Sequence, residues 1–433
     1  MKKLLFWWSE LKSTFWFVPV FIIFLGVLLA FGLVYGDNLS QFEPVGGVGF
    51  FFPGSPDAAK GILTTIAAAM IGVAGTVFSI TLVALTLASN QFGPRLVKNF
   101  MYDRINQTVL GTYVSLFIYC LIVLNTVKDT GAMQFTPVFS VAFALMMAIA
   151  NIVLLIVFIH HVATSIQADY IIANISGNLH RNLTRLFPQA MGDEGNPLRL
   201  DPEKVKGGYP ISQRLECSFD GYLQYIDSEE LINVVCELDV FLELYHRPGS
   251  YLIKGLELAE VHAYEKLEEA ALDRLRQQFL GGKTRTPQQD AEHAIHQMVE
   301  IAARALSPGV NDPYTAISCI DNLSSSLAYL TRVRFPSPYR VDDAGRLRIF
   351  ADVLTFDGMM DAAFNAIRQY AKDSPAVLIR LMEAMVTLGK FAVTAEQKQA
   401  IRKHAKMTWN LAKRQFAEGQ DLDDLKERYQ KIS

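Results

Sequence analysis

Three side chains that could bind a metal ion lie close together on one expected helix. His293, His296 and Glu300 fall within two turns of an expected helix, and imidazole and carboxylate groups are ligands that zinc prefers. Their spacing differs from the H-E-x-x-H pattern of helical zinc sites, and Glu300 has a simpler ion-pair partner in Arg304. We therefore interpret these residues as a polar stripe that faces solvent or an interface, and we expect neither a metal site nor a cofactor.

The segment that follows this helix is the strongest candidate for a binding loop. Residues 304–316 read R-A-L-S-P-G-V-N-D-P-Y-T-A, in which Pro and Gly can act purely as turn residues. Asn311 and Asp312 also precede a second expected helix, whose N-terminal amide groups can reach an outside partner. We predict a ligand-binding or subunit-contact loop that comprises Asp290, Arg304, Ser307, Asn311 and Asp312. The alternative, turn chemistry alone, stays open.

Other patterns with chemical meaning are missing from the sequence. The four cysteines are far apart, with no C-x-x-C pair, which is typical of ordinary reduced thiols. The sequence contains no phosphate-binding Gly loop, no G-x-S-x-G elbow and no dinucleotide fingerprint, so we expect no enzyme and no catalytic residues. A net charge of -3 gives no basic field for nucleic acid.

The first third of the chain contains long apolar runs, and any functional site there must lie on the helices that these runs form. Apolar residues make up 51% of the chain and charged residues only 19%. Runs at residues 15–35, 61–89, 109–127 and 137–159 are long enough to cross a bilayer, which needs about 20 helical residues, and none of the four contains a charged residue. We predict a four-helix transmembrane domain over residues 1–165.

The distribution of Lys and Arg predicts the orientation of this domain. These residues are concentrated before the first run, between the second and third, and after the fourth, which places both termini in the cytoplasm. Gly93 and Pro94 end the second helix, and the basic residues Arg95, Lys98 and Arg104 follow on a short amphipathic stretch. We expect these three side chains to contact lipid phosphates at the membrane interface.

The second apolar run has a polar face. Small and hydroxyl-bearing residues recur at steps of four and three along it, and with one aliphatic residue they form a stripe: Gly72, Thr76, Ser79, Val83, Thr86 and Asn90. Such a stripe permits close packing of helices. If several copies of the chain surround one axis, the same stripe can line a polar path. Both interpretations stay open.

Polar residues in the fourth run have simpler roles. Asn151 lies near the middle of this run, where we expect hydrogen-bonded packing against another helix. His160 and His161 follow where the run leaves the membrane. They can titrate near neutral pH as a sensor, although we favour an interfacial polar cap.

The remaining two thirds read as a cytoplasmic α+β region. Residues 166–210 form a helical extension and a linker rich in Gly and Pro, and residues 211–261 contain short alternating runs that predict a small β-barrel or β-sandwich module. Residues 221–227 and 248–261 resemble the two halves of a biotinyl/lipoyl-type barrel, but Lys254 lies in the wrong half to carry a cofactor. For residues 262–433 we predict a helical domain, with helices that start at Thr286, Ser374 and Thr394.

Three stretches together resemble a known family. They are S-N-Q-F-G-P-R-L-V-K-N-F at residues 89–100, the 304–316 segment, and D-A-A-F-N-A-I-R-Q-Y at residues 361–370. They are similar to the bacterial predicted membrane proteins catalogued as the domain-of-unknown-function 2254 family. The resemblance implies a multi-pass protein of the bacterial inner (plasma) membrane, with no assigned chemistry and no catalytic residues to transfer.

These observations lead to two hypotheses about function. The first is a homo-oligomeric membrane pore or channel-like protein, whose polar path is lined by the second transmembrane helix and whose cytoplasmic region is regulatory. Four helices without an internal repeat are too few for an inverted-repeat transporter, so the path must form between copies. The alternative is a membrane-anchored scaffold or signalling regulator whose cytoplasmic domains bind a protein or a small ligand. The expected partners are the lipid bilayer and further copies of the chain, but not nucleic acid.

Overall fold

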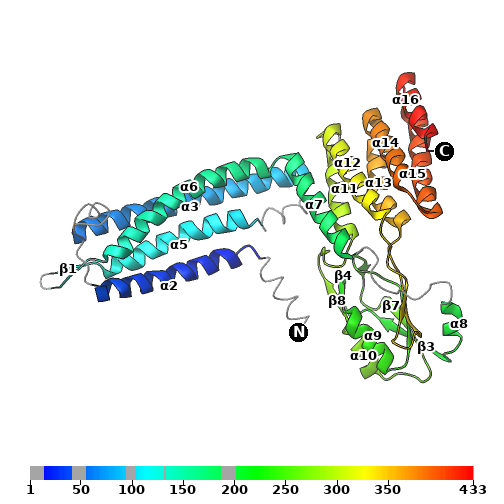
Figure 1. Cartoon of the computed structure of the whole chain (residues 1–433), viewed down its shortest axis with the longest axis horizontal. Coiled ribbons are helices and arrows are strands. Elements are labelled where there is room, and N and C mark those ends of the chain that lie inside the picture. Colours follow the sequence, from blue (N-terminus) through cyan, green and yellow to red (C-terminus); the bar gives the residue numbers. More distant parts are fainter. Residues whose placement is uncertain (1–13, 41–54, 94–102, 131–132, 187–200, 433) are drawn as a thin grey trace. The chain divides into compact units, whose positions relative to one another are not determined.

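The chain divides into two compact units at Tyr170 (Figure 1). The structure is a computed structural model, and it describes residues 14–40, 55–93, 103–130, 133–186 and 201–432. We call Met1–Tyr170 the membrane unit and Ile171–Ser433 the α/β unit.

The described part of the membrane unit is a bundle of four long apolar helices. Each is long and apolar enough to cross a bilayer, as the apolar runs predicted. They are α2 (Phe17–Ser40), α3 (Pro56–Phe92), α5 (Arg104–Thr126) and α6 (Val138–Ser165), and the strands β1 (Lys128–Thr130) and β2 (Met133–Phe135) form a hairpin between α5 and α6.

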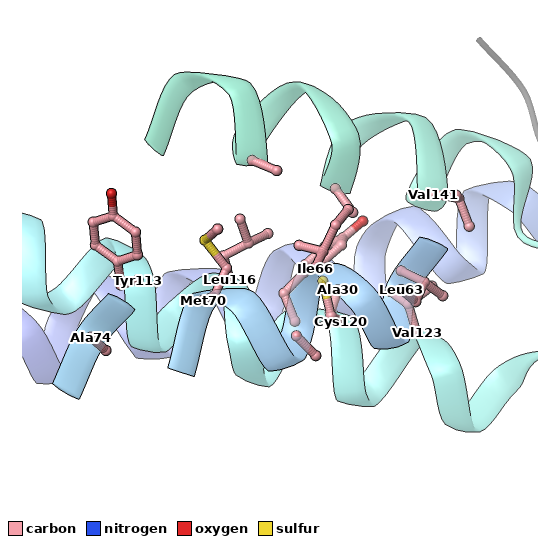
Figure 2. Packing of buried hydrophobic residues seen from close by; sticks show 14 of the residues in the cluster. Ala30, Leu63, Ile66, Met70, Ala74, Tyr113, Leu116, Cys120, Val123 and Val141 are labelled. Atoms are coloured by element: carbon pink, nitrogen blue, oxygen red, sulfur yellow. The ribbon is translucent and has the colours of Figure 1, made fainter. Parts of the chain in front are cut away.

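Helix α5 packs against α2, α3 and α6. Figure 2 shows its buried side chains Leu116, Cys120 and Val123 among residues of α3 such as Met70. Small residues bring α2 and α5 close together, because a Cβ atom at Gly26 would lie 2.0 Å from the Ser115 hydroxyl oxygen. Close contact of this kind replaces the hydrophobic effect as the source of helix association in lipid.

Asp37 caps α6 from within α2. Its carboxylate accepts hydrogen bonds from the amide groups of Phe139 (2.8 Å) and Ser140 (2.9 Å) and from the Ser140 hydroxyl (2.6 Å), and its side chain is 8% exposed. The prediction that no charged residue lies within a span is wrong here, because α2 continues past Tyr35 and includes Asp37.

The described residues of the α/β unit form two β-sheets. The five-stranded sheet has the order β3-β7-β5-β10-β9, in which only β10 and β5 pair in parallel, and the three-stranded sheet has the order β6-β4-β8. The strands are β3 (Ile211–Glu216), β4 (Gly221–Ile226), β5 (Phe241–Leu244), β6 (Tyr251–Leu252), β7 (Glu257–Ala263), β8 (Phe279–Gly282), β9 (Tyr339–Val341) and β10 (Leu347–Ala351).

These sheets correct the predicted barrel and the predicted helical region. Within the part of the chain that the structure describes, the two sheets are open and form no closed barrel. Strands β8, β9 and β10 all lie within residues 262–433, for which we predicted helices alone. Leu347 and Ile349 of β10 are buried, and their strand covers the edge of β5 that would otherwise expose unpaired backbone groups.

Helices complete the α/β unit. α9 and α10 pack beside the sheets, and α11 to α16 pack against one another. The helices are α7 (Ala168–Leu186), α8 (Pro202–Lys206), α9 (Ser228–Glu237), α10 (Glu269–Arg276), α11 (Glu292–Ala305), α12 (Pro313–Leu330), α13 (Phe356–Tyr370), η4 (Ala371–Asp373), α14 (Pro375–Phe391), α15 (Ala395–Gln415) and α16 (Gly419–Gln430). The starts after Ser374 and Thr394 are confirmed, whereas the predicted start at Thr286 is wrong.

A buried histidine links α13 and α15. His404 is 1% exposed, and its Nε2 atom lies 3.2 Å from Asp361 Oδ1. Burial lowers the pKa of the His404 imidazole to about 4, because the charged ring would lose its hydration. At neutral pH this ring is therefore uncharged.

We expect this burial to make the α/β unit less stable in acid. The pKa of an unfolded histidine is about 6.5, so between pH 6.5 and 4 only the unfolded chain binds the proton. The stabilisation is complete above pH 6.5 and is lost as the pH falls through 4, by about 3 kcal/mol. Thermal unfolding of the wild type and of His404→Gln between pH 7.5 and 4.5 tests this. The variant should show a flatter pH dependence, and an identical slope would contradict the prediction.

Candidate functional site

The predicted stripe of α3 lies on the outer surface of the membrane unit. All six of its residues are exposed: Gly72, Thr76, Ser79, Val83, Thr86 and Asn90. The opposite face of α3, which includes Leu63, Met70 and Val77, is buried in the bundle core. A Cβ atom at Gly72 would meet nothing within 4 Å. The stripe is therefore accessible to lipid or to another copy of the chain.

The hydroxyl groups of the stripe donate to their own helix. Thr76 donates to the Gly72 carbonyl (3.2 Å), Ser79 to that of Gly75 (3.0 Å) and Thr86 to that of Leu82 (2.9 Å). This local pattern satisfies each hydroxyl donor without a partner from another helix. The hydroxyl oxygens still have lone pairs that can accept a hydrogen bond or contact a cation.

The interior of the bundle is packed with apolar side chains. Two buried tyrosine hydroxyls form hydrogen bonds between its helices: Tyr113 donates to the Asn151 carbonyl (2.5 Å) and Tyr119 to the Ser140 carbonyl (2.9 Å). The Asn151 side chain is also buried. A groove of about 810 Å³ between α2, α5 and α6 is lined mainly by aliphatic residues. The stripe on α3, in contrast, carries the polar side chains of Thr76, Ser79, Thr86 and Asn90 on the outer face of the bundle.

Only part of the predicted basic stretch lies in the described chain. Arg95 and Lys98 are outside the described residues, and Arg104 is the exposed first residue of α5. Asp103 caps α5 by accepting from the Ile105 amide (2.8 Å), and its other oxygen lies 2.6 Å from His161 Nε2. His161 therefore joins the end of α6 to the start of α5, as a polar cap does.

The structure separates Asp290 from the other residues of the predicted loop. Asp290 precedes α11, whereas Arg304 lies in its last turn. In the turn itself, Ser307 donates to the Arg304 carbonyl (2.6 Å), and the Asp312 carboxylate accepts from the amide (3.1 Å) and hydroxyl (2.6 Å) of Thr315. Asn311 has a positive φ of 50° and is exposed.

Asp290 instead belongs to a buried ion pair. It is 3% exposed, and its oxygens accept from Arg285 Nε (2.6 Å) and Nη2 (2.9 Å) and from the Glu292 amide (3.1 Å). The turn at Gly249 approaches this pair so closely that a Cβ atom there would lie 2.7 Å from Asp290 Oδ2. Since Gly249 has a φ of +99°, only glycine fits this position without strain.

Further charges extend from this pair to the surface. Arg247 donates to Asp352 (2.9 Å) and to Glu292 (3.1 Å), and Glu292 lies 3.9 Å from His296. Burial raises the pKa of the Glu292 carboxyl, but His296 and Arg247 outweigh burial and hold the pKa below its ordinary value. The Glu292 carboxyl is therefore ionised at neutral pH.

An apolar cavity of about 520 Å³ lies beside this charge network. Its lining is mainly aliphatic, with Ile226, Leu244 and Ile349 among its residues, and Arg247 and Asp352 contribute charged groups. A cavity with an apolar lining and a few polar groups is the usual form of a small-molecule site. Sequence reasoning missed it because its walls come from segments far apart in the chain. The local signals were Arg247, Pro248 and Gly249, which we interpreted as part of a β module.

Comparison with known proteins supports the assignment of the chain to membrane proteins. A family model described as "Predicted membrane protein (DUF2254)" matches residues 12–387. Uncharacterized proteins of Mycobacterium bovis and Mycobacterium tuberculosis are each 31% identical to the chain over 421 residues, which cover 95% of this chain and 78% of each relative. No solved structure matches the chain.

Proposed function

The chain belongs to the DUF2254 family of predicted membrane proteins, and we propose that it is a homo-oligomeric channel-like protein of the bacterial inner membrane. In this proposal the α3 stripes of several copies line a polar path, and both termini and the α/β unit are cytoplasmic. The observation that supports it best is the outward position of the stripe on the membrane unit. We assign the chain no catalytic activity and no nucleic-acid partner.

The packed bundle interior supports a path between copies rather than through one copy. Membrane-spanning pathways need polar or backbone groups that replace part of the hydration of an ion. In the described residues, a row of such groups lies on the outer face of α3, where the hydroxyls of Thr76, Ser79 and Thr86 retain free lone pairs. A closed ring of copies would bring several of these rows around one axis.

Ion flux from liposomes that contain the full chain tests the proposal. We expect flux above that of protein-free liposomes, and we expect Thr76→Leu combined with Thr86→Leu to abolish it, because leucine offers no acceptor for an ion or water. The matched control, Thr76→Ser combined with Thr86→Ser, retains both hydroxyls and should retain flux. Unchanged flux in the leucine variant would contradict a path lined by α3, as would a strictly monomeric native mass spectrum.

The cavity of the α/β unit favours a second candidate function, a membrane-anchored regulator that binds a small molecule. Its apolar lining beside Arg247 and Asp352 suits a ligand with an apolar body and a polar end. We expect Ala351→Phe, which fills the cavity from β10, to remove a small molecule that is bound to the full chain in native mass spectra. If the wild type carries no such molecule, this candidate is not supported.

A further inference from the structure

Two glutamates and a histidine meet on one face of the five-stranded sheet. Strands β5 and β7 are antiparallel, and their register places Glu243 directly opposite Glu260. His262 lies two residues further along β7, so it shares the face of Glu260. The ligand atoms of the three side chains all lie within 4.8 Å of one another. Because the strands carry the side chains, the sheet register maintains this arrangement.

The Nε2 atom of His262 lacks a hydrogen-bond partner in this cluster. The residue is 7% exposed, and its Nε2 atom is buried without a hydrogen bond, 3.7 Å from Glu260 Oε2. The Phe241 ring lies 5.6 Å from the imidazole. A buried polar atom without a partner is rare in folded proteins, and an ion that occupies the site is one established explanation.

The two glutamates have only one cation between them in the described structure. Like charges directly opposite on neighbouring strands repel. Lys206 Nζ lies 2.7 Å from Glu243 Oε2, but it also lies 3.1 Å from Glu203 Oε1. The remaining partners of Glu260 are neutral donors, the hydroxyls of Ser212 and Tyr245. The cluster therefore carries more negative charge than Lys206 balances.

We propose that Glu243, Glu260 and His262 bind a divalent transition-metal ion such as Zn²⁺. One imidazole nitrogen and two carboxylate oxygens form a ligand set that suits zinc, whereas calcium and magnesium prefer oxygen ligands alone. Two ligands that are each about 2.0–2.1 Å from a tetrahedral zinc ion lie about 3.3 Å apart. The 3.7 Å between His262 Nε2 and Glu260 Oε2 therefore needs only a small closure. Solvent can supply the fourth ligand.

Lys206 is the competitor of the metal ion in this site. It extends from the five-residue helix α8 and contacts the carboxylate of Glu243. An incoming dication must share or displace this contact. The removal of the Lys206 ammonium group should therefore tighten metal binding, whereas a general loss of structure would weaken it.

A second group of similar composition provides an internal control. Asp357, Asp361 and His404 also bring their ligand atoms within 4.8 Å of one another. The ring nitrogens of His404 are also buried without a hydrogen bond, but Lys403 Nζ donates to Asp357 (2.9 Å) and to Asp361 (2.8 Å). One ammonium group therefore already joins both carboxylates. We assign the metal ion to the Glu243 cluster and not to this one.

Calorimetric titration of the chelator-treated full chain with Zn²⁺, in detergent and without a histidine tag, tests the proposal. We expect one ion per chain. His262→Gln and Glu243→Gln should each raise the Kd for Zn²⁺ by at least about 100-fold, and Lys206→Gln should lower it. The matched variants of the second group, His404→Gln and Lys403→Gln, should leave the Kd unchanged.

Three outcomes would overturn the proposal. The first is an unchanged Kd in His262→Gln, and the second is an effect that follows His404→Gln and Lys403→Gln instead. If His262→Gln and Glu243→Gln lose the far-UV circular dichroism spectrum of the folded chain, Lys206→Gln tests the proposal instead, because it removes no ligand. The third outcome is then an unchanged or raised Kd for Zn²⁺ in Lys206→Gln. X-ray absorption of the zinc-loaded chain should show nitrogen and oxygen ligands at about 2.0–2.2 Å.

Discussion

Replacement of Asp290 by Ala is expected to destabilise the α/β unit by about 3 kcal/mol. The substitution leaves the Arg285 guanidinium without its two hydrogen bonds in a site where Asp290 is 3% exposed. It also removes the acceptor of the Glu292 amide at the start of α11. The cost arises mainly because the partly buried Arg285 guanidinium loses its closest partner and keeps only Glu292, 3.7 Å away, and less because a favourable attraction is lost. Thermal unfolding of the detergent-solubilised chain measures the effect.

An exposed ion pair in the same unit gives the matched control. Asp273 contacts Arg276 in α10, but the Asp273 side chain is 54% exposed, so Asp273→Ala should cost less than about 1 kcal/mol. A second variant, Asp290→Leu with Arg285→Met, removes both charges and should be more stable than Asp290→Ala. Equal effects of Asp290→Ala and Asp273→Ala would show that burial of the Arg285 pair does not determine the cost.

The sequence predicted those features that depend on local patterns. Four apolar runs predicted four membrane helices, because the length of a spanning helix is set by the thickness of the hydrocarbon layer. Steps of four and three predicted that Gly72, Thr76 and Ser79 share a helix face, and the structure places all three on the outer surface. The start of α15 was predictable because a capping box lies within four residues, Thr394 to Gln397.

Features that depend on distant residues were not predictable in this way. Ile349 of β10 pairs with Leu242 of β5. The two residues are far apart in the sequence, and their residue types do not specify this pairing. The cluster of Glu243, Glu260 and His262 depends on the register between β5 and β7. His293 and His296 lie on one helix, where sequence spacing alone brings side chains together, whereas the three residues of the cluster meet only through the pairing of two strands.

For Asp290, the sequence predicted polar contacts but not the correct partner. We predicted that it takes part in a functional loop with Arg304 and Asp312, because it lies on the polar face of the expected helix that leads into this loop. The structure instead joins it to Arg285, five residues before it, and separates it from Arg304 by α11. Sequence spacing alone could not reveal that the Gly249 turn covers this pair.

Replacement of Asp37 by Ala is expected to destabilise the membrane unit by about 2–3 kcal/mol. The amides of Phe139 and Ser140 and the Ser140 hydroxyl would lose their acceptor at the start of α6. Water cannot easily replace that acceptor, because Asp37 is 8% exposed within the bundle. Hydrogen exchange at the first amides of α6 should accelerate, and thermal unfolding should occur at lower temperature.

Two further variants, Asp57→Ala and Asp37→Asn, separate the effect of burial and of the Asp37 charge from the loss of its hydrogen-bond acceptors. Asp57 also lies in a membrane helix, but its side chain is 82% exposed and its ion pair with Lys60 is 3.7 Å long, so Asp57→Ala should have an effect below about 1 kcal/mol. Asp37→Asn keeps an oxygen acceptor but loses the charge, and we expect a stability between those of the wild type and Asp37→Ala. Fast exchange confined to α6 in Asp37→Ala would identify the cap as the cause, whereas equal exchange in wild type and Asp37→Ala would contradict it.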